Sequence, residues 1–459
     1  MPNLFLVMCV GLALKRYSGN SVQKSTNGSQ AVSRFGVGPP GRVDKPEVNS
    51  LSSMNILLIH QNFPGQYKHI AVALVARGDT VTALCIENNP APAGVRIIRY
   101  GPKRDNTPNL HPWLQDTESK IIRGEACFLA ARSLQDQGYR PDLICAHPGW
   151  GEALFIKELW PAVPLLNYFE FYYHTHHADV GFDPEFPENP DDAPRLIAKN
   201  FANLMNLEHC DAGISPTQWQ KSTHPATYQP KIRVIHEGID TTAITPKLDT
   251  QINLQEKAQT LRPGDEVVTF VNRNLEPYRG YHSFIRAVPE IQRRRPKAHI
   301  LIVGGDGVSY GSPPAQGSTY RELFLNEVRN DVDFQRLHFV GWIPYPAFIG
   351  LLQVSAVHVY LSYPFVLSWS MLEAMSAGCL VVGSKTPPVT EVITHGDNGL
   401  LVDFFSPNQI AEQVTQALES SGDFVPIRQR ARQTIIDCYD LQRVCLPQHL
   451  AYIDECIGH

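Results

Sequence analysis

The chain has 459 residues and a formal net charge of −5, so it is too long for one ordinary domain and lacks the strong basic excess of a nucleic-acid-binding protein. Its nine cysteines are scattered without a CxxC pair, which indicates reduced core thiols rather than a metal site or a disulfide framework. No stretch approaches the roughly 20 consecutive apolar residues that a membrane-spanning helix needs. We therefore expect a globular protein of two or three domains.

The first 53 residues are rich in Ser, Asn, Gln, Gly and Pro after an apolar opening at residues 4–14. No basic residue precedes that opening, and Lys15 and Arg16 stand where a signal peptide carries small residues. We interpret residues 1–53 as a disordered extension, and we expect the folded protein to begin at Met54. Whether the extension belongs to the natural protein stays open.

From Met54 onward, short apolar runs typical of buried strands alternate with helical patterns. The expected strands are residues 55–59, 80–85, 95–99, 143–146, 165–168, 212–214 and 232–235. The expected helices are residues 67–77, 116–137, 152–159 and 195–209. This alternation predicts a parallel sheet covered by helices on both faces.

The alternation breaks at residues 246–265, a polar stretch that we interpret as an interdomain linker. A second series follows, with expected strands at 267–271, 299–303, 337–340, 356–360, 380–383 and 399–402 and expected helices at 281–294, 319–330, 369–377 and 407–419. We expect domains at 54–245 and 266–438, followed by a C-terminal helical segment at 439–459. Two doubly wound α/β domains would share a cleft, because ligands of such sheets bind beyond the carboxyl ends of the strands.

Two motifs follow the opening strands of the second domain. Arg273 and Arg279 lie on a strand-to-helix loop, and guanidinium groups suit a diphosphate. The next strand ends in Gly304 and Gly305, which allow the backbone to approach a ligand closely. Each motif alone is also consistent with an ordinary solvated loop or turn. The Gly-, Ser- and Pro-rich stretch 307–318 is interpreted as a flap over the cleft.

The most specific pattern lies at residues 363–384, where a loop leads into a helix, a glycine stop and an apolar strand. Glu373 stands among apolar helix neighbours, so its carboxylate needs a partner. The helix is expected to open at about Ser368, and the backbone of Leu367, Ser368 and Trp369 then forms a natural anion site. Together these features predict a cleft for a ligand with both phosphate and hydroxyl groups.

Functional candidates in the first domain also follow strands. Gly65 lies in the loop after the opening strand, and His147 ends a later strand before a turn with glycines, which is a favoured place for a functional residue. A plain turn and a loop histidine bonded to backbone are the alternatives. The aromatic and histidine-rich stretch 168–177 matches no zinc spacing and is interpreted as a ligand-facing wall or as core. The acidic residues 179–192 are interpreted as a solvated excursion.

Residues 363–384 resemble the signature of the retaining family 4 glycosyltransferases, in which a Glu, seven residues and a second Glu precede Ala-Met-x-x-Gly and an apolar strand. Glu373 matches the second Glu, whereas Phe365 stands where the first is expected. Arg273 and Arg279 are similar to the basic residues of the family's phosphate loop. The resemblance runs from about Met54 to the C-terminal helix. It implies the GT-B architecture, with two Rossmann-like domains facing a central cleft.

The resemblance implies a retaining enzyme that moves a sugar from a nucleotide-diphosphate donor to a glycan, lipid-linked or small-molecule acceptor, as in the synthesis of cell-surface polysaccharides or glycoconjugates. Catalytic roles fall to His147 at the sugar and to Arg273 and Arg279 at the diphosphate. Donor-binding roles fall to Glu373, Phe365, Leu367, Ser368, Trp369, Gly304, Gly305 and Gly65. No metal or cofactor is required, because the nucleotide sugar is a substrate, and no nucleic acid is expected as a partner.

A phenyl ring at Phe365 cannot accept the hydrogen bonds of a glutamate. Three interpretations stay open. The donor sugar presents an apolar or deoxy face to Phe365, or the loop shifts so that Ser362, Ser368 or Ser370 binds the sugar in place of the glutamate, or transferase activity is lost. A degenerate GT-B subunit that binds nucleotide sugar or glycan for a partner enzyme is therefore the alternative outside catalysis, and a GT-B phosphorylase or epimerase is the enzymatic one. We expect a cytoplasmic protein, and the basic residues at 96–104 and 293–297 leave peripheral contact with the inner face of the membrane open.

Overall fold

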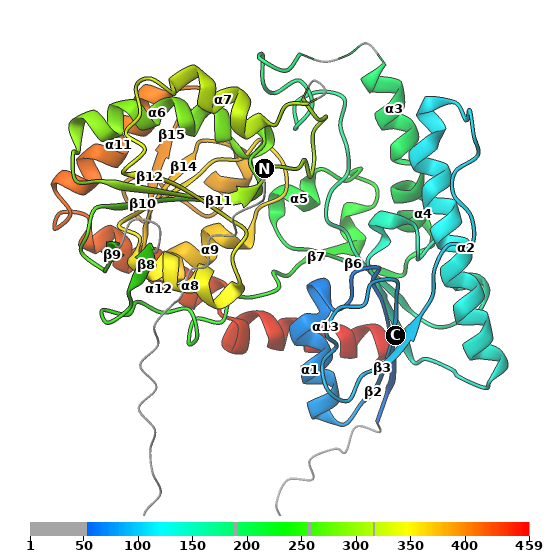
Figure 1. Cartoon of the computed structure of the whole chain (residues 1–459). Coiled ribbons are helices and arrows are strands. Elements are labelled where there is room, and N and C mark those ends of the chain that lie inside the picture. Colours follow the sequence, from blue (N-terminus) through cyan, green and yellow to red (C-terminus); the bar gives the residue numbers. More distant parts are fainter. Residues whose placement is uncertain (1–52, 188, 190, 255–258, 315–316, 459) are drawn as a thin grey trace, which may run out of the picture.

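The computed structural model of the chain describes residues 53–187, 189, 191–254, 259–314 and 317–458. The predicted disordered extension at 1–53 therefore lies, apart from Ser53, outside the described residues. The described chain forms two α/β domains, each built on a parallel sheet (Figure 1). The predicted fold class, α/β with two Rossmann-like domains, is confirmed.

The first domain holds a seven-stranded parallel sheet in the order β3-β2-β1-β4-β5-β6-β7. Its strands are β1 (Asn55–Ile59), β2 (Thr80–Cys85), β3 (Arg96–Arg99), β4 (Leu143–Ala146), β5 (Leu165–Tyr168), β6 (Ala212–Ser215) and β7 (Ile232–Val234). Its helices are α1 (Lys68–Arg77), α2 (Gln115–Asp136), α3 (Asp192–Lys199), α4 (Phe201–His209) and α5 (Gln218–Ser222). In β1, Ile56 and Leu58 pack on the α1 face, and Leu57 and Ile59 pack on the α2 face. Helices on both faces explain the continuous apolar runs of these strands.

The second domain repeats this plan with a six-stranded parallel sheet in the order β12-β11-β10-β13-β14-β15. Its strands are β10 (Val267–Asn274), β11 (His299–Gly305), β12 (Leu337–Gly341), β13 (Val357–Tyr360), β14 (Leu380–Ser384) and β15 (Leu400–Val402). Its helices are α6 (Tyr281–Arg294), α7 (Tyr320–Val328), α8 (Tyr345–Val354), α9 (Trp369–Ser376), α10 (Pro387–Thr390), α11 (Pro407–Glu419) and α12 (Val425–Cys438). Helices α6, α7 and α11 cover one face of the sheet, and α8, α9 and α12 cover the other (Figure 1).

The chain between the domains contains a two-stranded antiparallel hairpin, β8 (Ile252–Leu254) and β9 (Gln259–Leu261). Its buried residues Ile252, Leu254 and Leu261 join the core of the second domain. Strands of three residues are too short to show a period in the sequence, which is why the stretch 246–265 was expected to be only a linker.

Two helices of the first domain also differ from the sequence-based expectation. Residues 195–209 form two helices that meet at Asn200, and only Ile156–Glu158 form a 3₁₀ turn within 152–159.

The C-terminal helix α13 (Leu446–Gly458) returns to the first domain and packs beside α1 (Figure 1). Tyr452 and Ile453 are buried in the core on that face of the first sheet. Asp454 accepts a hydrogen bond from the Arg77 guanidinium at 2.6 Å, and Glu455 pairs with Arg233 at 2.7 Å. The end of the chain therefore links the two domains, and it covers the face of the first sheet that lies opposite α2.

A second interdomain link is formed by residues 178–187, here called the strap. The prediction of a solvated excursion is wrong for this segment, because Asp179 and Asp183 are buried. The ring of Phe182 lies 5.0 Å from the Tyr363 ring and 5.3 Å from the Phe404 ring of the second domain. Phe186 contacts the ring of Phe324 on α7 at 6.3 Å. Acidic residues and prolines indicate an exposed loop, but these two phenylalanines anchor the strap in an apolar surface.

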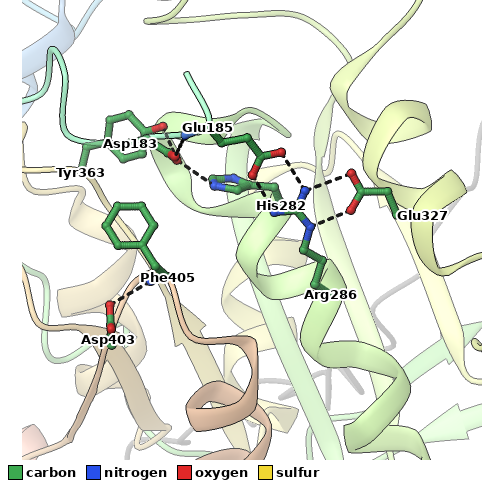
Figure 2. Close-up of polar contacts among 8 residues, drawn as sticks. All are labelled: Asp183, Glu185, His282, Arg286, Glu327, Tyr363, Asp403 and Phe405. Carbon is green, nitrogen blue, oxygen red and sulfur yellow. Dashed lines mark hydrogen bonds and ion pairs between the residues drawn. The ribbon is translucent and has the colours of Figure 1, made fainter. Parts of the chain in front are cut away.

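The acidic side chains of the strap are paired with the second domain (Figure 2). Asp183 accepts hydrogen bonds from His282 Nε2 at 2.9 Å and from the Tyr363 hydroxyl at 2.7 Å. Both carboxylate oxygens of Glu185 accept from Arg286 at 2.7 Å. Ligand atoms of Asp183, Glu185 and His282 lie within 4.8 Å of one another, a spacing that a metal ion could use. Because these groups already bond to each other and to Arg286, we interpret them as an interdomain clamp.

Candidate active site

A cavity of about 680 Å³ lies between the two domains. It opens at the carboxyl ends of strands from both sheets, where ligands of doubly wound folds bind. The first domain contributes polar wall residues that include Gln66, Lys68, His69, Glu170, Gln220, Glu237 and Asp240. The second domain contributes Arg273, Arg279, Trp342, Tyr345, Glu373 and the loop before α9. Such a volume is typical of a site for a small molecule.

The two predicted arginines line the same wall but are held differently. Arg279 is buried, and its Nη1 donates to Ser362 Oγ at 2.8 Å and to the Val366 carbonyl at 3.0 Å. Its guanidinium also lies 5.2 Å from the ring of Tyr310. Arg273, near the end of β10, is exposed to the cavity. Arg279 therefore shapes the loop before α9, whereas Arg273 presents its charge to the cavity.

Glu373 faces the cavity from the first turns of α9. Its carboxylate accepts a hydrogen bond from the Tyr345 hydroxyl at 2.5 Å. Burial raises the pKa of Glu373, and the bond from Tyr345 and the nearby Lys68 charge act against this rise. The carboxylate that the sequence placed among apolar neighbours is thus partnered and turned toward the cavity.

The start of α9 also points at the cavity. Ser368 is the N-cap residue, with its hydroxyl accepting from the Ser370 N–H at 3.4 Å, and its own N–H donates to the Tyr360 hydroxyl at 2.8 Å. Trp369 donates its indole N–H to Glu237 of the first domain at 3.1 Å. Leu367, Ser368 and Trp369 all line the cavity. The free N–H groups of a helix start favour an anion at this position.

Eight of the predicted site residues line the cavity: Arg273, Arg279, Glu373, Leu367, Ser368, Trp369, Gly304 and Gly65. Phe365, Gly305 and His147 do not belong to its lining. Phe365 is buried in an aromatic cluster, with its ring 4.7 Å from Phe171 and 5.0 Å from Tyr310. Gly305 lies against Trp342, whose indole nitrogen would clash with an added Cβ.

His147 follows β4 and is buried directly behind the cavity wall. Its ring stacks on Trp150 at 4.3 Å and on Tyr168 at 5.4 Å. Burial lowers the pKa of His147 well below its usual range, and the neighbouring His60 acts in the same direction. The imidazole is therefore neutral. Its Nε2 lies 3.9 Å from Oε2 of Glu170, which does line the cavity.

Sequence reasoning did not place two carboxylates of the first domain, Glu170 and Glu237, among the site residues. Burial raises the pKa of Glu170 to about 7, the Glu237 charge adds to this rise, and Arg273 and Arg279 oppose it. Glu237 accepts hydrogen bonds from the Tyr168 hydroxyl and from Trp369. The position of Glu170 two residues beyond β5 was the signal that could have identified it, because strand ends in the first sheet face the cleft.

The loop after Gly307 is anchored rather than free over the part that the structure describes. The carboxylate of Glu276 accepts from the backbone N–H groups of Ser309 and Tyr310 at 3.1 Å and of Gly311 at 3.4 Å. Asn274 donates to the Ser309 hydroxyl at 2.8 Å. These bonds place Tyr310 in the cavity wall, with its ring near the Arg279 guanidinium. The movement of this segment as a flap stays a prediction.

Comparison with known families agrees with this geometry. Residues 77–244 match the model of the glycosyl transferase family 4 group, and residues 252–435 match that of the glycosyl transferases group 1. The two matches together span well over half of the chain. The chain therefore belongs to the family 4, group 1 glycosyltransferases, and the predictions of this family and of a glycosyl-transferring enzyme class are confirmed.

Curated relatives are similar over part or most of their length. A D-inositol 3-phosphate glycosyltransferase of Corynebacterium efficiens is 25% identical over 305 residues, which cover 64% of this chain and 67% of the relative. The protein of that name from Corynebacterium aurimucosum is 24% identical over 59% of this chain and 60% of its own length. The one from Nocardioides sp. is 23% identical over 83% of this chain and 80% of its own length. The chain thus spans less than two thirds of the Corynebacterium aurimucosum relative's length.

Solved structures show the same fold. Sucrose-phosphate synthase from Thermosynechococcus elongatus has a TM-score of 0.64 at 17% identity, covering 88% of this chain and 100% of its own. HepE of Anabaena, solved in complex with UDP and glucose, has a TM-score of 0.60 at 15% identity with the same coverage. The GT-B architecture predicted from the sequence is confirmed.

Proposed function

We propose that this protein is a retaining glycosyltransferase that takes its sugar from a nucleoside-diphosphate donor. The observation that carries the proposal is the convergence of Arg273, Glu373 and the start of α9 on one interdomain cavity. The arginine and the helix start suit a diphosphate, and a carboxylate suits the hydroxyl groups of a ribose. A uridine nucleotide is the first donor to test, since HepE binds UDP-glucose.

In this proposal the glycosidic bond to the diphosphate breaks as the acceptor hydroxyl attacks from the same face. The departing phosphate takes the hydroxyl proton, so no separate base is needed. Arg273, Arg279 and the N–H groups before α9 stabilise the charge that develops on the leaving diphosphate. Preorganised donors of this kind contribute roughly 2.7–4 kcal/mol apiece to lowering a barrier. No step is assigned to a metal or a cofactor.

The acceptor is proposed to enter from the first domain. Lys68 and His69 line that side of the cavity, and a cationic group beside the beginning of α1 suits an acceptor with a phosphate. The relatives named for D-inositol 3-phosphate make a phosphorylated polyol the first small acceptor to test, beside glycan and lipid-linked acceptors.

Among the residues that the structure describes, no helix has the length and apolar character to cross a membrane. We place the protein in the cytoplasm, with peripheral membrane contact as a question for lipid-binding assays.

The test is release of nucleoside diphosphate from a panel of nucleotide sugars, with and without acceptors. Arg273→Ala and Glu373→Ala are expected to reduce acceptor-dependent release strongly at a donor concentration below the KM of the parent protein. Arg293→Ala is the matched control, because Arg293 is an exposed arginine of α6 that pairs with Glu290 of the same helix. Retention of the anomeric configuration, measured by NMR on the product, checks the stereochemistry. Turnover that survives both cavity substitutions would contradict the proposal.

The aromatic burial of Phe365 favours a second candidate, a subunit that binds nucleotide sugar without transferring it. Position 365 offers no polar side chain to a sugar. Tight binding of a nucleotide sugar without release of diphosphate on any acceptor would support this candidate. Glu373→Ala would then weaken the binding of the nucleotide sugar, and neither the parent protein nor the variant would release nucleoside diphosphate.

A further inference from the structure

The segment that leads into α9, residues 363–369 and here called the α9 loop, is held by both domains. Its hydrogen bonds to the first domain fall on alternate residues, and the pairs are Tyr363 with Asp183, Phe365 with Trp219, Leu367 with Gln220, and Trp369 with Glu237. The intervening Val366 and Ser368 bond instead to Arg279 and Tyr360 of the second domain. The position of this loop therefore depends on the first domain as well as on its own.

The two middle contacts come from the short helix α5 of the first domain. Trp219 Nε1 donates to the Phe365 carbonyl at 3.1 Å, and Gln220 Oε1 accepts from the Leu367 N–H at 3.4 Å. Gln220 and Leu367 belong to the cavity lining, whereas Trp219 does not. An effect of Trp219 on a ligand in the cavity would therefore have to pass through the α9 loop.

Helix α5 is itself fixed against the second domain by Glu391, which follows α10. The two carboxylate oxygens of Glu391 accept from the backbone N–H groups of Gln218 and Trp219, each at 2.7 Å, and such charge-assisted bonds are strong. On the other side, Gln220 Nε2 donates to the Glu170 carbonyl at 2.8 Å. The Trp219 indole is thus carried by a helix with bonds to both domains.

The backbone of the α9 loop matters because the start of α9 is proposed to face the diphosphate. N–H groups at a helix start bind an anion well only when they are held in the direction of the charge. The Phe365 side chain lies in an aromatic cluster with Phe171 and Tyr310. The bond from Trp219 reaches the Phe365 carbonyl, so it fixes the backbone whatever side chain position 365 carries.

We propose that Trp219 is a positioning residue for glycosyl transfer, which holds the α9 loop so that the start of α9 faces the diphosphate of the donor. Gln220 supports the same loop two residues further on. The inference rests on the proposed function and adds to it a residue outside the cavity lining. Because the bond crosses the domain boundary, affinity for the diphosphate depends on contact between the domains.

The experiment compares Trp219→Phe with Trp160→Phe in the full chain. Trp219→Phe keeps an aromatic ring and removes the N–H that bonds to the loop. Trp160→Phe is the matched control in the core of the first domain, because Trp160 is buried and its Nε1 has no hydrogen-bond partner within the part of the chain that the structure describes. Hydrogen–deuterium exchange of the free proteins comes first. Peptides that cover residues 363–371 should exchange at least threefold faster in Trp219→Phe and at the parent rate in Trp160→Phe.

Calorimetry with UDP, followed by displacement of UDP by uridine, tests the consequence for the site. Trp219→Phe is expected to weaken UDP binding by more than twofold and up to roughly tenfold, the range that one neutral hydrogen bond accounts for. Uridine has no diphosphate, so its affinity should stay within twofold of the parent value. A merely structural role of Trp219 would instead lower the affinity for both ligands alike.

The inference is overturned if the exchange of the α9 loop is unchanged in Trp219→Phe, if UDP binds within twofold of the parent value, or if UDP and uridine lose affinity equally. In each of these cases release of nucleoside diphosphate by the parent protein would leave the proposed function standing. A parent protein that binds no nucleoside diphosphate would refute the proposed function, and the inference with it.

Discussion

The indole N–H of Trp369 donates a hydrogen bond at 3.1 Å to the carboxylate of Glu237, and this bond joins the two domains across the cavity. Trp369 is the first residue of α9, while Glu237 follows β7 of the first domain. The same carboxylate accepts from the Tyr168 hydroxyl at the end of β5. The helix start proposed to face the diphosphate is therefore positioned by the first domain as well as by its own.

Arg279 and Arg273 are expected to respond differently to substitution. Arg279→Met removes buried donors from Ser362 Oγ and the Val366 carbonyl, and we expect it to lower the free energy of unfolding by roughly 1–3 kcal/mol. Arg273→Ala removes an exposed side chain, so stability should change by less than about 0.5 kcal/mol. Both should lower kcat/KM, by roughly 100- to 1,000-fold for a lost transition-state donor. Denaturant titration alongside initial rates separates the two effects, and equal destabilisation by both variants would contradict this assignment.

Glu373→Ala should weaken donor binding without destabilising the protein. The carboxylate is buried with a raised pKa, so its removal relieves a desolvation cost. The loss of charge-assisted hydrogen bonds to the donor is worth roughly 1.5–3 kcal/mol, or about 10- to 100-fold in affinity. Calorimetry with UDP and a thermal melt of the free protein measure the two quantities. Tyr345→Phe is the companion variant, because it removes the 2.5 Å bond to Glu373 while the carboxylate is kept.

Phe365→Glu should not restore a sugar-binding carboxylate. The side chain would lie among the rings of Phe171, Tyr278 and Tyr310 instead of in the cavity. Truncation of a buried phenylalanine costs roughly 3–5 kcal/mol, and we expect a loss of that size with donor preference unchanged. Phe365→Leu is the control that retains an apolar side chain. A stable Phe365→Glu protein with a new donor preference would show that the loop can turn toward the cavity.

The strap offers a comparison of a buried and an exposed interdomain contact. Asp183→Ala leaves His282 and the Tyr363 hydroxyl without their buried acceptor, so we expect a loss of roughly 1–3 kcal/mol. Glu185→Ala breaks a pair with Arg286 in which the two side chains are 40% and 28% exposed, and such pairs contribute roughly 0–1 kcal/mol. Chemical denaturation and limited proteolysis at the strap measure both. Equal effects would mean that burial does not govern this contact.

Glu152 is expected to make the protein less stable as the pH rises. Its side chain is fully buried, its carboxylate oxygens have no hydrogen-bond partner among the described residues, and burial raises its pKa to about 7. Between the ordinary pKa of a glutamate and about 7 the folded state holds a proton that the unfolded state has lost, so stability falls with increasing pH over this window. Glu152→Gln should remove roughly 3 kcal/mol of that dependence. The free energy of unfolding of the parent protein and of Glu152→Gln is measured at pH 5 and at pH 8. An equal change between the two pH values in both proteins would refute the prediction.

The alternation of strands and helices could be predicted from the sequence because it depends on neighbours in the chain. β1 at Asn55–Ile59 and β2 at Thr80–Cys85 have the predicted bounds, since buried parallel strands read as continuous apolar runs between turns. Arg273, Glu373 and Gly304 were likewise identifiable, because their positions at strand and helix ends are local properties of the sequence. That these residues share one cavity followed from the general geometry of doubly wound sheets.

Only the tertiary structure decided which other side chains reach the cavity. Glu170 and Phe365 are separated by nearly 200 positions, yet the ring of Phe171, the residue after Glu170, packs on the Phe365 ring. In this arrangement the Glu170 side chain lines the cavity and the Phe365 ring does not. The strap is buried for the same kind of reason, since Asp183 meets His282 about 100 residues later in the chain. Local patterns encode the period of an element and the chemistry of its turns. Contacts between domains depend on shape and on polar partners that no short stretch of sequence contains.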